Sequence, residues 1–152
     1  MCSCEFFFLF FLIFFFFCFF KLFLLVLKSR VFIVDKTSTL KGVCIKVLRG
    51  KRFACLGNCF LLSVRSRSAR RASFLKLRLQ RKFSVGSMHR ALLLRSKKNF
   101  MRFPGIFVKF FENSCALVNR RVVPISNRIY GPVLKELCML WPSVGCVSKE
   151  IF

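Results

Sequence analysis

Lysine and arginine residues are concentrated in three short clusters of this 152-residue chain. Guanidinium and ammonium groups pair with phosphate oxygens, and several of them on one surface hold a polyanion by displacing its counterions. We therefore predict that the clusters bind the phosphates of a nucleic acid. The residues are Lys46, Arg49, Lys51 and Arg52 in the first cluster, Arg65, Arg67, Arg70 and Arg71 in the second, and Arg95, Lys97, Lys98 and Arg102 in the third.

The charge balance favours the same interpretation. The chain has 28 Lys and Arg residues against 5 Asp and Glu residues, a formal net charge of +23. Residues 29–152 carry 26 of the basic and 4 of the acidic side chains. Because such an excess on a small domain is self-repelling, it predicts a polyanionic partner. Nucleic acid and an acidic membrane surface both fit, while a single basic cluster would more often be a solvated surface.

Residue types that carry catalysis or bind metals are few. His89 is the only histidine, and the spacing of the cysteines and carboxylates indicates no partner for it. The pairs Cys2/Cys4 and Cys55/Cys59 lack the spacing and the second pair that a zinc site needs. We expect no enzymatic activity, no metal site and no cofactor.

Residues 1–28 form a separate apolar leader with 24 apolar residues and 12 of the 23 Phe of the chain. The stretch Phe6–Leu27, interrupted by Lys21, is long enough to span a hydrocarbon core of ~30 Å as a helix. It lacks the basic start and the cleavage site of a secretory signal. The residue types of the leader, mainly Phe and Leu, are also those that U-rich codons encode. Three interpretations stay open: a membrane anchor, an extension packed against a neighbouring protein, and a product of biased base composition.

Residues 29–152 predict one mainly β domain. Short apolar segments alternate with basic or Gly, Pro and Asn turns, a pattern typical of a small barrel or sandwich. The expected strands are Val31–Val34, Val43–Leu48, Phe60–Arg65, Phe74–Leu79, Ala91–Arg95, Ile106–Phe111 and Cys115–Val118.

The C-terminal region predicts one short helix. Pro132 stands at its first position, apolar residues follow at helical spacing as far as Trp141, and Pro142 ends it. Arg128 precedes this helix, whose free N–H groups could also hold a phosphate, so we add Arg128 to the RNA-binding residues.

Four motifs occur in the order and spacing of one known family. They resemble the universal large-subunit ribosomal protein fourteen family, which has a C-I-K-V-L strand, a K-A-V-V-V-R-T-K-K strand, an F-D-x-N-A-x-V-L-x-N strand and an R-I-F-G-P-V-x-R-E-L segment. The resemblance runs from about Arg30 to Phe152 and leaves the leader outside. The matching segments here are Val43–Leu48, Arg90–Lys98, Phe111–Asn119 and Asn127–Leu137.

The resemblance implies a small five-stranded β-barrel with a short C-terminal helical part, following the Phe-rich extension of residues 1–28. It implies a structural constituent of the large ribosomal subunit that binds large-subunit rRNA near the subunit interface. The implied protein neighbours are large-subunit proteins three and nineteen, and a bridge would reach small-subunit rRNA. The family's docking site for a ribosome-silencing factor corresponds to Asn127 and Arg128.

Base bias and divergence favour an organellar ribosome in the mitochondrial matrix, with the plastid as the alternative. The competing class is a single-pass basic membrane protein without a ribosomal role, and membrane contact by the leader is compatible with either class. Two departures from the family stand out. The stretch Arg65–Lys82 is about ten residues longer than the family's loop, and Arg102-Phe103-Pro104-Gly105 replaces R-P-D-G.

Overall fold

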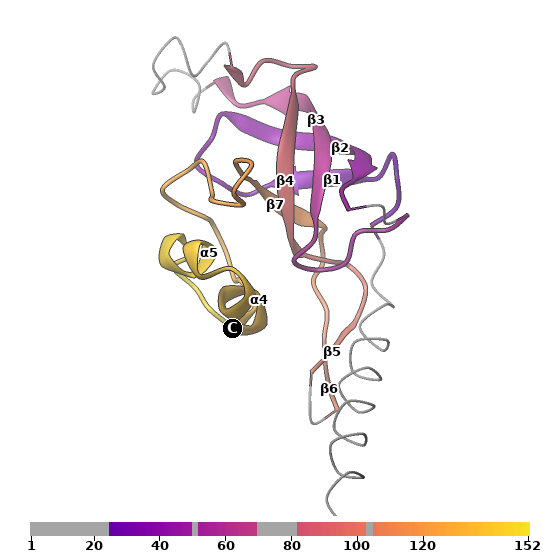
Figure 1. Cartoon of the computed structure of the whole chain (residues 1–152), viewed down its shortest axis with the longest axis vertical. Coiled ribbons are helices and arrows are strands. Elements are labelled where there is room, and N and C mark those ends of the chain that lie inside the picture. Colours follow the sequence, from indigo (N-terminus) through magenta and orange to yellow (C-terminus); the bar gives the residue numbers. More distant parts are fainter. Residues whose placement is uncertain (1–24, 50–51, 70–81, 103–104) are drawn as a thin grey trace, which may run out of the picture.

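The structure, a computed structural model, describes residues 25–49, 52–69, 82–102 and 105–152. Five strands close into a barrel in the order β1-β2-β3-β4-β7 (Figure 1). Neighbouring strands are antiparallel except β1 and β7, which run parallel. The predicted five-stranded barrel is confirmed. Its strands are β1 (Arg30–Ile33), β2 (Thr39–Val47), β3 (Cys59–Arg67), β4 (Met88–Arg95) and β7 (Ser114–Leu117).

The pleat of the strands separates the core from the surface. In β1, Val31 and Ile33 are buried while Arg30 and Phe32 are exposed. The second half of β4 has no such alternation, because all its residues from Ala91 to Arg95 are buried. A strand buried on both faces needs cover outside the barrel as well as inside. The C-terminal region supplies apolar side chains to the same core cluster, among them Leu134, Leu137 and Val144.

Strand β2 is bulged, and Gly42 lies at one of its irregularities. A Cβ atom at this position would lie 2.0 Å from Leu62 Cδ1 and 3.0 Å from the carbonyl oxygen of Ser63. No L-residue with a side chain fits there without moving β3 away, because such contacts are far inside van der Waals distance. Gly42 therefore permits the close approach of β2 and β3 on which the barrel wall depends.

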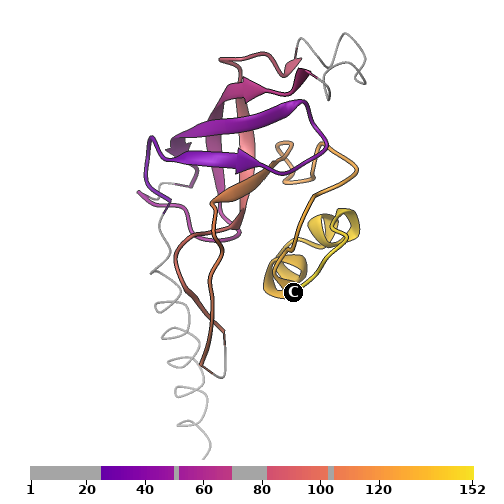
Figure 2. The same cartoon turned by 180° about the vertical axis from the view of Figure 1, so that it is seen from behind.

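A second, two-stranded sheet extends from the end of β4. Strands β5 (Phe100–Arg102) and β6 (Ile106–Val108) pair antiparallel and form a hairpin that projects away from the barrel (Figures 1 and 2). The prediction of a barrel strand over Ile106–Phe111 was thus wrong in length and place. The apolar side chains that produced it point largely to solvent, since Ile106 and Phe107 are 57% and 64% exposed.

The C-terminal region contains two short helices, α4 (Lys135–Leu140) and α5 (Pro142–Val147), instead of the single predicted helix. Pro142 does not end the helical region. It begins α5, because proline at the first turn of a helix lacks only an N–H group that would have no partner there. Pro132 does not open α4 either, since Val133 pairs with Ile151 in an isolated β-bridge before the helix starts.

Leu25 extends the domain toward the N terminus beyond the predicted boundary between residues 28 and 29. It is 2% exposed, belongs to the core cluster, and exchanges two backbone hydrogen bonds with Ala54. Within the described ranges, no helix has the length and apolar character needed to cross a membrane. Residues 1–24 of the leader and the predicted strand Phe74–Leu79 lie outside the described residues.

Candidate RNA-binding surface

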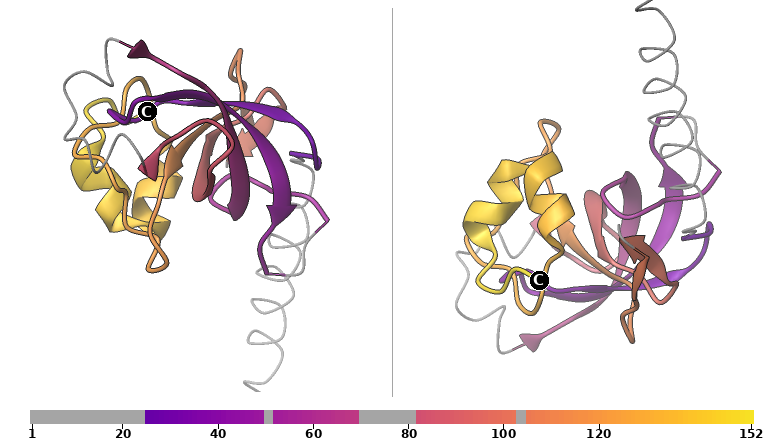
Figure 3. Two further views of the ribbon diagram at one scale, coloured as in Figure 1. Left: turned by 90° about the horizontal axis from the view of Figure 1, so that it is seen from above. Right: turned by 90° about the horizontal axis from the view of Figure 1, so that it is seen from below.

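The strand register places the described residues of the first and third basic clusters at one end of the barrel, and Arg65 and Arg67 of the second cluster toward the other. Val47 pairs with Phe60 at one end of the β2–β3 ladder, and Thr39 pairs with Arg67 at the opposite end. Phe60 also pairs with β4, four residues before Arg95, so β4 ends on the Val47 side. At ~3.3 Å per residue the two ends of β2 are about 25 Å apart. Figure 3 shows the molecule from above and from below, with the C-terminal helices beside the barrel strands.

Five lysines and arginines of the first and third clusters are exposed at the Val47 end, which we call the basic end. None of the five forms an ion pair within the described part of the chain. Asn113 fixes the turn after β4 by accepting a hydrogen bond of 2.8 Å from the Lys97 N–H group. Lys51 lies outside the described residues. The basic end comprises Lys46, Arg49, Arg52, Lys97 and Lys98.

The second cluster is described only in part. Arg65 is exposed on β3, and Arg67 is partly buried at its end. Arg70 and Arg71 lie outside the described residues. Among the described residues of this cluster, Arg65 is therefore the one with an exposed side chain on the wall of the barrel.

Arg95 differs from its neighbours in the third cluster because it is buried, with 9% of its surface exposed. Its guanidinium donates hydrogen bonds to Ser114 Oγ and, over 3.2 Å, to the Tyr130 carbonyl oxygen, and it lies 3.5 Å from a Glu112 carboxylate oxygen. Burial lowers the pKa of Arg95, and the carboxylates of Glu112 and Glu150 oppose that shift. Arg95 therefore connects β4, β7 and the C-terminal region from the inside.

Gly131 completes this arrangement. Its φ angle is +77°, and a Cβ atom there would lie 2.5 Å from Arg95 Nη1. The glycine thus serves two needs at once, since it adopts a conformation that L-residues avoid and makes room for the guanidinium. The resemblance rested partly on this Gly131, and the structure gives a physical reason for it.

Arg102 at the end of β5 also has partners inside the protein. Its Nε donates to Glu136 Oε1, and its Nη2 donates to Glu136 Oε2 and to the Phe152 carbonyl oxygen, each over 3.0 Å. Partial burial alone would raise the pKa of Glu136, but the hydrogen bonds from Arg102 outweigh it and lower that pKa. The hairpin is thereby attached to α4 and the C terminus.

Arg128 and Asn127, the predicted docking residues, lie on the segment between the barrel and α4. Asn127 is exposed, and the Arg128 guanidinium lies over the Tyr130 ring at 5.6 Å from its centroid. The Nε of Arg128 is buried and has no hydrogen-bond partner among the described residues. The segment is held to the barrel because Lys36 N–H donates to the Arg128 carbonyl oxygen over 3.1 Å.

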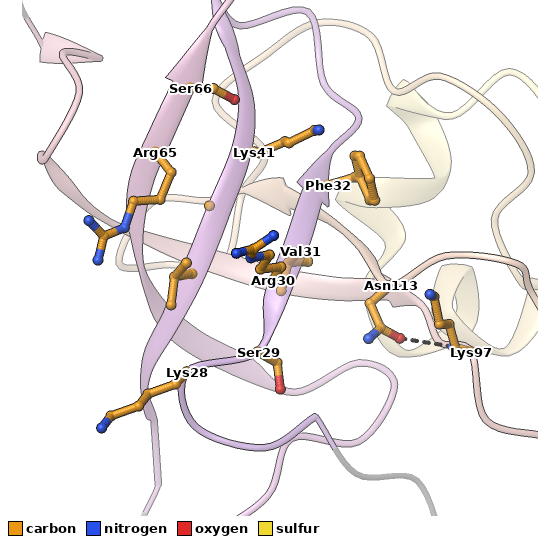
Figure 4. A pocket seen from close by; sticks show the side chains of 12 residues that line it. Lys28, Ser29, Arg30, Val31, Phe32, Lys41, Arg65, Ser66, Lys97 and Asn113 are labelled. Atoms are coloured by element: carbon orange, nitrogen blue, oxygen red, sulfur yellow. Dashed lines mark hydrogen bonds between the residues drawn. The ribbon is translucent and has the colours of Figure 1, made fainter.

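A groove of about 940 Å³ runs along the outside of β1, β2 and β3, and Figure 4 shows the side chains that line it. We call it the lateral groove. Two of its cations, Arg65 and Lys97, were predicted to bind RNA, whereas Lys28, Arg30 and Lys41 were not. Among the described residues, no acidic one lines it. The alternation of β1 and β2 could have indicated the missed residues. It places single cations on the outer face of the barrel, although these cations form no run in the sequence.

A scan against family models gives one decisive observation, a match of residues 24–152 to the family described as ribosomal protein L14p/L23e. The chain belongs to this family. L14p/L23e proteins are structural, non-enzymatic proteins of the large ribosomal subunit that bind rRNA and neighbouring ribosomal proteins. The predicted family is confirmed, and the matched region takes in the whole of the described barrel and C-terminal part. A single-pass membrane protein without a ribosomal role is inconsistent with this membership.

The side chains considered above for catalysis and metal binding have structural contacts in this L14p/L23e protein. His89 Nε2 lies 2.9 Å from Ser87 Oγ and 3.0 Å from the Lys82 carbonyl oxygen, and its ring is 5.1 Å from that of Phe83. Burial lowers the pKa of His89, and the hydrogen bond with the Lys82 carbonyl oxygen opposes that shift. Across the described ranges, no three His, Cys, Asp or Glu side chains gather as metal ligands would.

Proposed function

We propose that this L14p/L23e protein binds large-subunit rRNA in an organellar ribosome mainly through the basic end of its barrel. The observation that carries the proposal is the group of exposed cations from two separate chain segments at that end, without an acidic ion-pair partner in the described residues. Such a surface neutralises phosphates and gains affinity by releasing counterions. Folded rRNA would be recognised there by shape and backbone, with Arg49 and Arg52 able to stack as well as pair.

In this proposal the predicted RNA-binding residues divide into two roles. The exposed residues Lys46, Arg49, Arg52, Lys97 and Lys98 contact phosphates directly. Arg95 and Arg102 act as positioning residues, because their guanidinium groups are already bonded to protein acceptors. Lys51, Arg70 and Arg71 remain proposed contacts on grounds of sequence alone.

We further propose protein and RNA neighbours on the other surfaces. Asn127 and Arg128 are exposed or partly exposed on a segment anchored to the barrel, which suits a docking site for a ribosome-silencing factor. Large-subunit proteins three and nineteen would cover apolar surface such as Met139 and Leu140, 71% and 60% exposed on α4. A bridge to small-subunit rRNA would use cations that large-subunit rRNA leaves free.

The proposed compartment is the mitochondrial matrix, with the plastid as the second choice. Support comes from the Phe-rich segment of residues 1–28, whose residue types are those of U-rich codons in a strongly biased genome. That segment could also contact a membrane or a neighbouring ribosomal protein. Localisation of a tagged full chain, followed by carbonate extraction, distinguishes these cases because a spanning helix stays with lipid.

The experiment that tests the function is incorporation of the full chain into large subunits. Charge reversal at Lys46, Lys97 and Lys98 should strongly reduce the fraction that sediments with the large subunit, because three phosphate contacts become repulsive. The matched control reverses three other exposed cations, Arg120, Arg121 and Lys149, of which the two arginines follow the end of β7 that lies opposite the basic end. Sedimentation of the Lys46/Lys97/Lys98 variant at the wild-type level would contradict the proposed surface.

A further inference from the structure

The lateral groove contains an aromatic side chain among its cations. Phe32 of β1 is 38% exposed and lines the groove together with Lys28, Arg30, Lys41 and Lys97. A single exposed apolar residue is ordinary on a protein surface. An aromatic ring in a concave site lined by cations is a different case. Single-stranded RNA offers a base to stack on such a ring and phosphates to pair with the cations.

The position of Phe32 is fixed by the barrel. Its N–H donates to the Asn113 carbonyl oxygen over 2.9 Å, and its Cα partners in the sheet are Lys41 on β2 and Ser114 on β7. The cross-strand partner Lys41 places its Nζ 5.3 Å from the centre of the Phe32 ring. Figure 4 shows the ring standing on β1 with Lys41 on one side and Asn113 on the other. The ring is therefore held by strands on both sides, which limits the ordering cost of a contact with a ligand.

The cations around the ring have no carboxylate partner among the described residues. None of Lys28, Arg30, Lys41, Arg65 and Lys97 forms an ion pair with the described residues. Proteins that bind single-stranded nucleic acid combine such a basic groove with aromatic rings on which bases stack. A duplex keeps its base faces inside the stack, so it offers the ring no base on which to stack. The cavity is in the size range that holds small organic ligands, so one nucleotide fits.

We propose that the lateral groove holds an unpaired segment of RNA, with one base stacked on Phe32 and the adjoining phosphates on Arg30 and Lys41. This inference rests on the proposed function, because it names the form of RNA that this part of the surface takes. An acidic peptide would satisfy the cations but would leave the ring without a partner, so it fits the groove less completely.

The test uses the full chain and a short single-stranded RNA containing 2-aminopurine, whose fluorescence is quenched on stacking. Phe32→Leu keeps an apolar side chain but removes the ring, so we expect affinity to fall about 5- to 10-fold, the lower part of the range for one stacked base, with loss of quenching. Phe32→Tyr should retain both. Phe107→Leu, at an exposed phenylalanine of β6 outside the groove, is the matched control and should bind like wild type.

Three outcomes decide the matter. Equal affinity and quenching for wild type and Phe32→Leu would overturn the stacking proposal. The choice of unpaired RNA would be overturned if a blunt RNA duplex or an acidic peptide displaced the single-stranded RNA and lost affinity in Phe32→Leu. The same preparations are assayed for sedimentation with large subunits. If the wild type sediments with large subunits and Phe32→Leu binds RNA normally, only the stacking proposal for the lateral groove is refuted. If the wild type fails to sediment, the proposed function is refuted as well.

Discussion

Arg95 and Lys97 lie two residues apart in one basic cluster, yet their surroundings are opposite. Arg95 is buried and bonded to Ser114 and Tyr130, and Glu112 lies within ion-pair distance. Lys97 is exposed, and only its backbone N–H group is held by the protein. Position in the strand explains the difference, because β4 ends at Arg95 and the turn beyond it leaves the barrel. A basic run in the sequence can therefore contain both a structural residue and a ligand contact.

The acidic residues follow the same division. Residues 29–152 contain only Asp35, Glu112, Glu136 and Glu150. Glu112 lies beside Arg95, Glu136 binds Arg102, and Asp35 accepts backbone hydrogen bonds inside the protein. Asp35 pairs with Ile129 in a β-bridge, Arg95 donates to the Tyr130 carbonyl oxygen, and Glu136 lies on α4, so all three are on the junction between the barrel or its hairpin and the C-terminal region, which we call the seam. In the part of the chain that the structure describes, the basic end has no such partners, and its field remains available for a polyanion.

The largest effect on the seam is expected from Asp35→Ala. Asp35 is fully buried, its Oδ1 accepts hydrogen bonds from the Thr37 N–H and hydroxyl groups, and its Oδ2 accepts one of 2.9 Å from Leu117 N–H. Removing the carboxylate leaves these buried donors without their acceptor, which costs about 3–5 kcal/mol of unfolding free energy. Thermal denaturation should show a fall in Tm of about 10 °C or more.

The control for Asp35→Ala is Glu150→Ala, at an exposed carboxylate near the C terminus. A surface substitution of this kind should change stability by no more than about 0.5 kcal/mol. If both variants melted like wild type, the few acids of the domain would not be structural, and the contrast between seam and basic end would fail.

The barrel was predictable because its strands carry period-two or continuous apolar patterns, and because four motifs matched a known family. The errors fell where the same residue types serve other purposes. The apolar residues Ile106 and Phe107 belong to an exposed hairpin, so apolarity did not indicate burial. Pro142 begins a helix instead of ending one, because Pro has both uses and only the path of the chain decides between them.

The candidate surface was predictable in part for a related reason. Runs of cations reveal loops, and Lys97 and Lys98 are exposed as such runs usually are. The burial of Arg95 depends on Glu112 and Tyr130, which are distant in sequence, so no local pattern indicates it. The lateral groove was missed because its cations come from different strands and meet only after the barrel closes.

A paired substitution separates the two roles within the third cluster. Arg95→Met leaves Glu112, Ser114 and the Tyr130 carbonyl without their donor, so unfolding free energy should fall by about 2–4 kcal/mol. Lys97→Met should change stability by less than about 0.5 kcal/mol. For rRNA binding the order reverses. Lys97→Met removes one phosphate contact, so the slope of log affinity against log salt concentration should fall in magnitude by about 1. Arg95→Met removes no such contact and should leave this slope unchanged below the Tm of the variant. Equal effects of the two variants in both assays would remove the distinction.

The smallest effect is expected at the partly exposed pair of Arg102 and Glu136. A double-mutant cycle with Arg102→Met and Glu136→Gln should give a coupling of about 0.5–1 kcal/mol at pH 7, because exposed pairs gain little over solvation. The pKa of Glu136 is lowered in the folded state from its ordinary value of 4.5, so the unfolded chain takes up the proton first as pH falls.

The coupling should therefore be fully present above pH 4.5 and disappear as pH falls through the lower folded-state pKa of Glu136. Urea titrations of the four proteins of the cycle at pH 7 and at pH 3 measure this change. High salt should also reduce the coupling at pH 7, because a partly exposed pair is screened. A coupling that changed neither with pH nor with salt would show that Arg102 and Glu136 are linked by a hydrogen bond to the neutral carboxyl group and not by their charges.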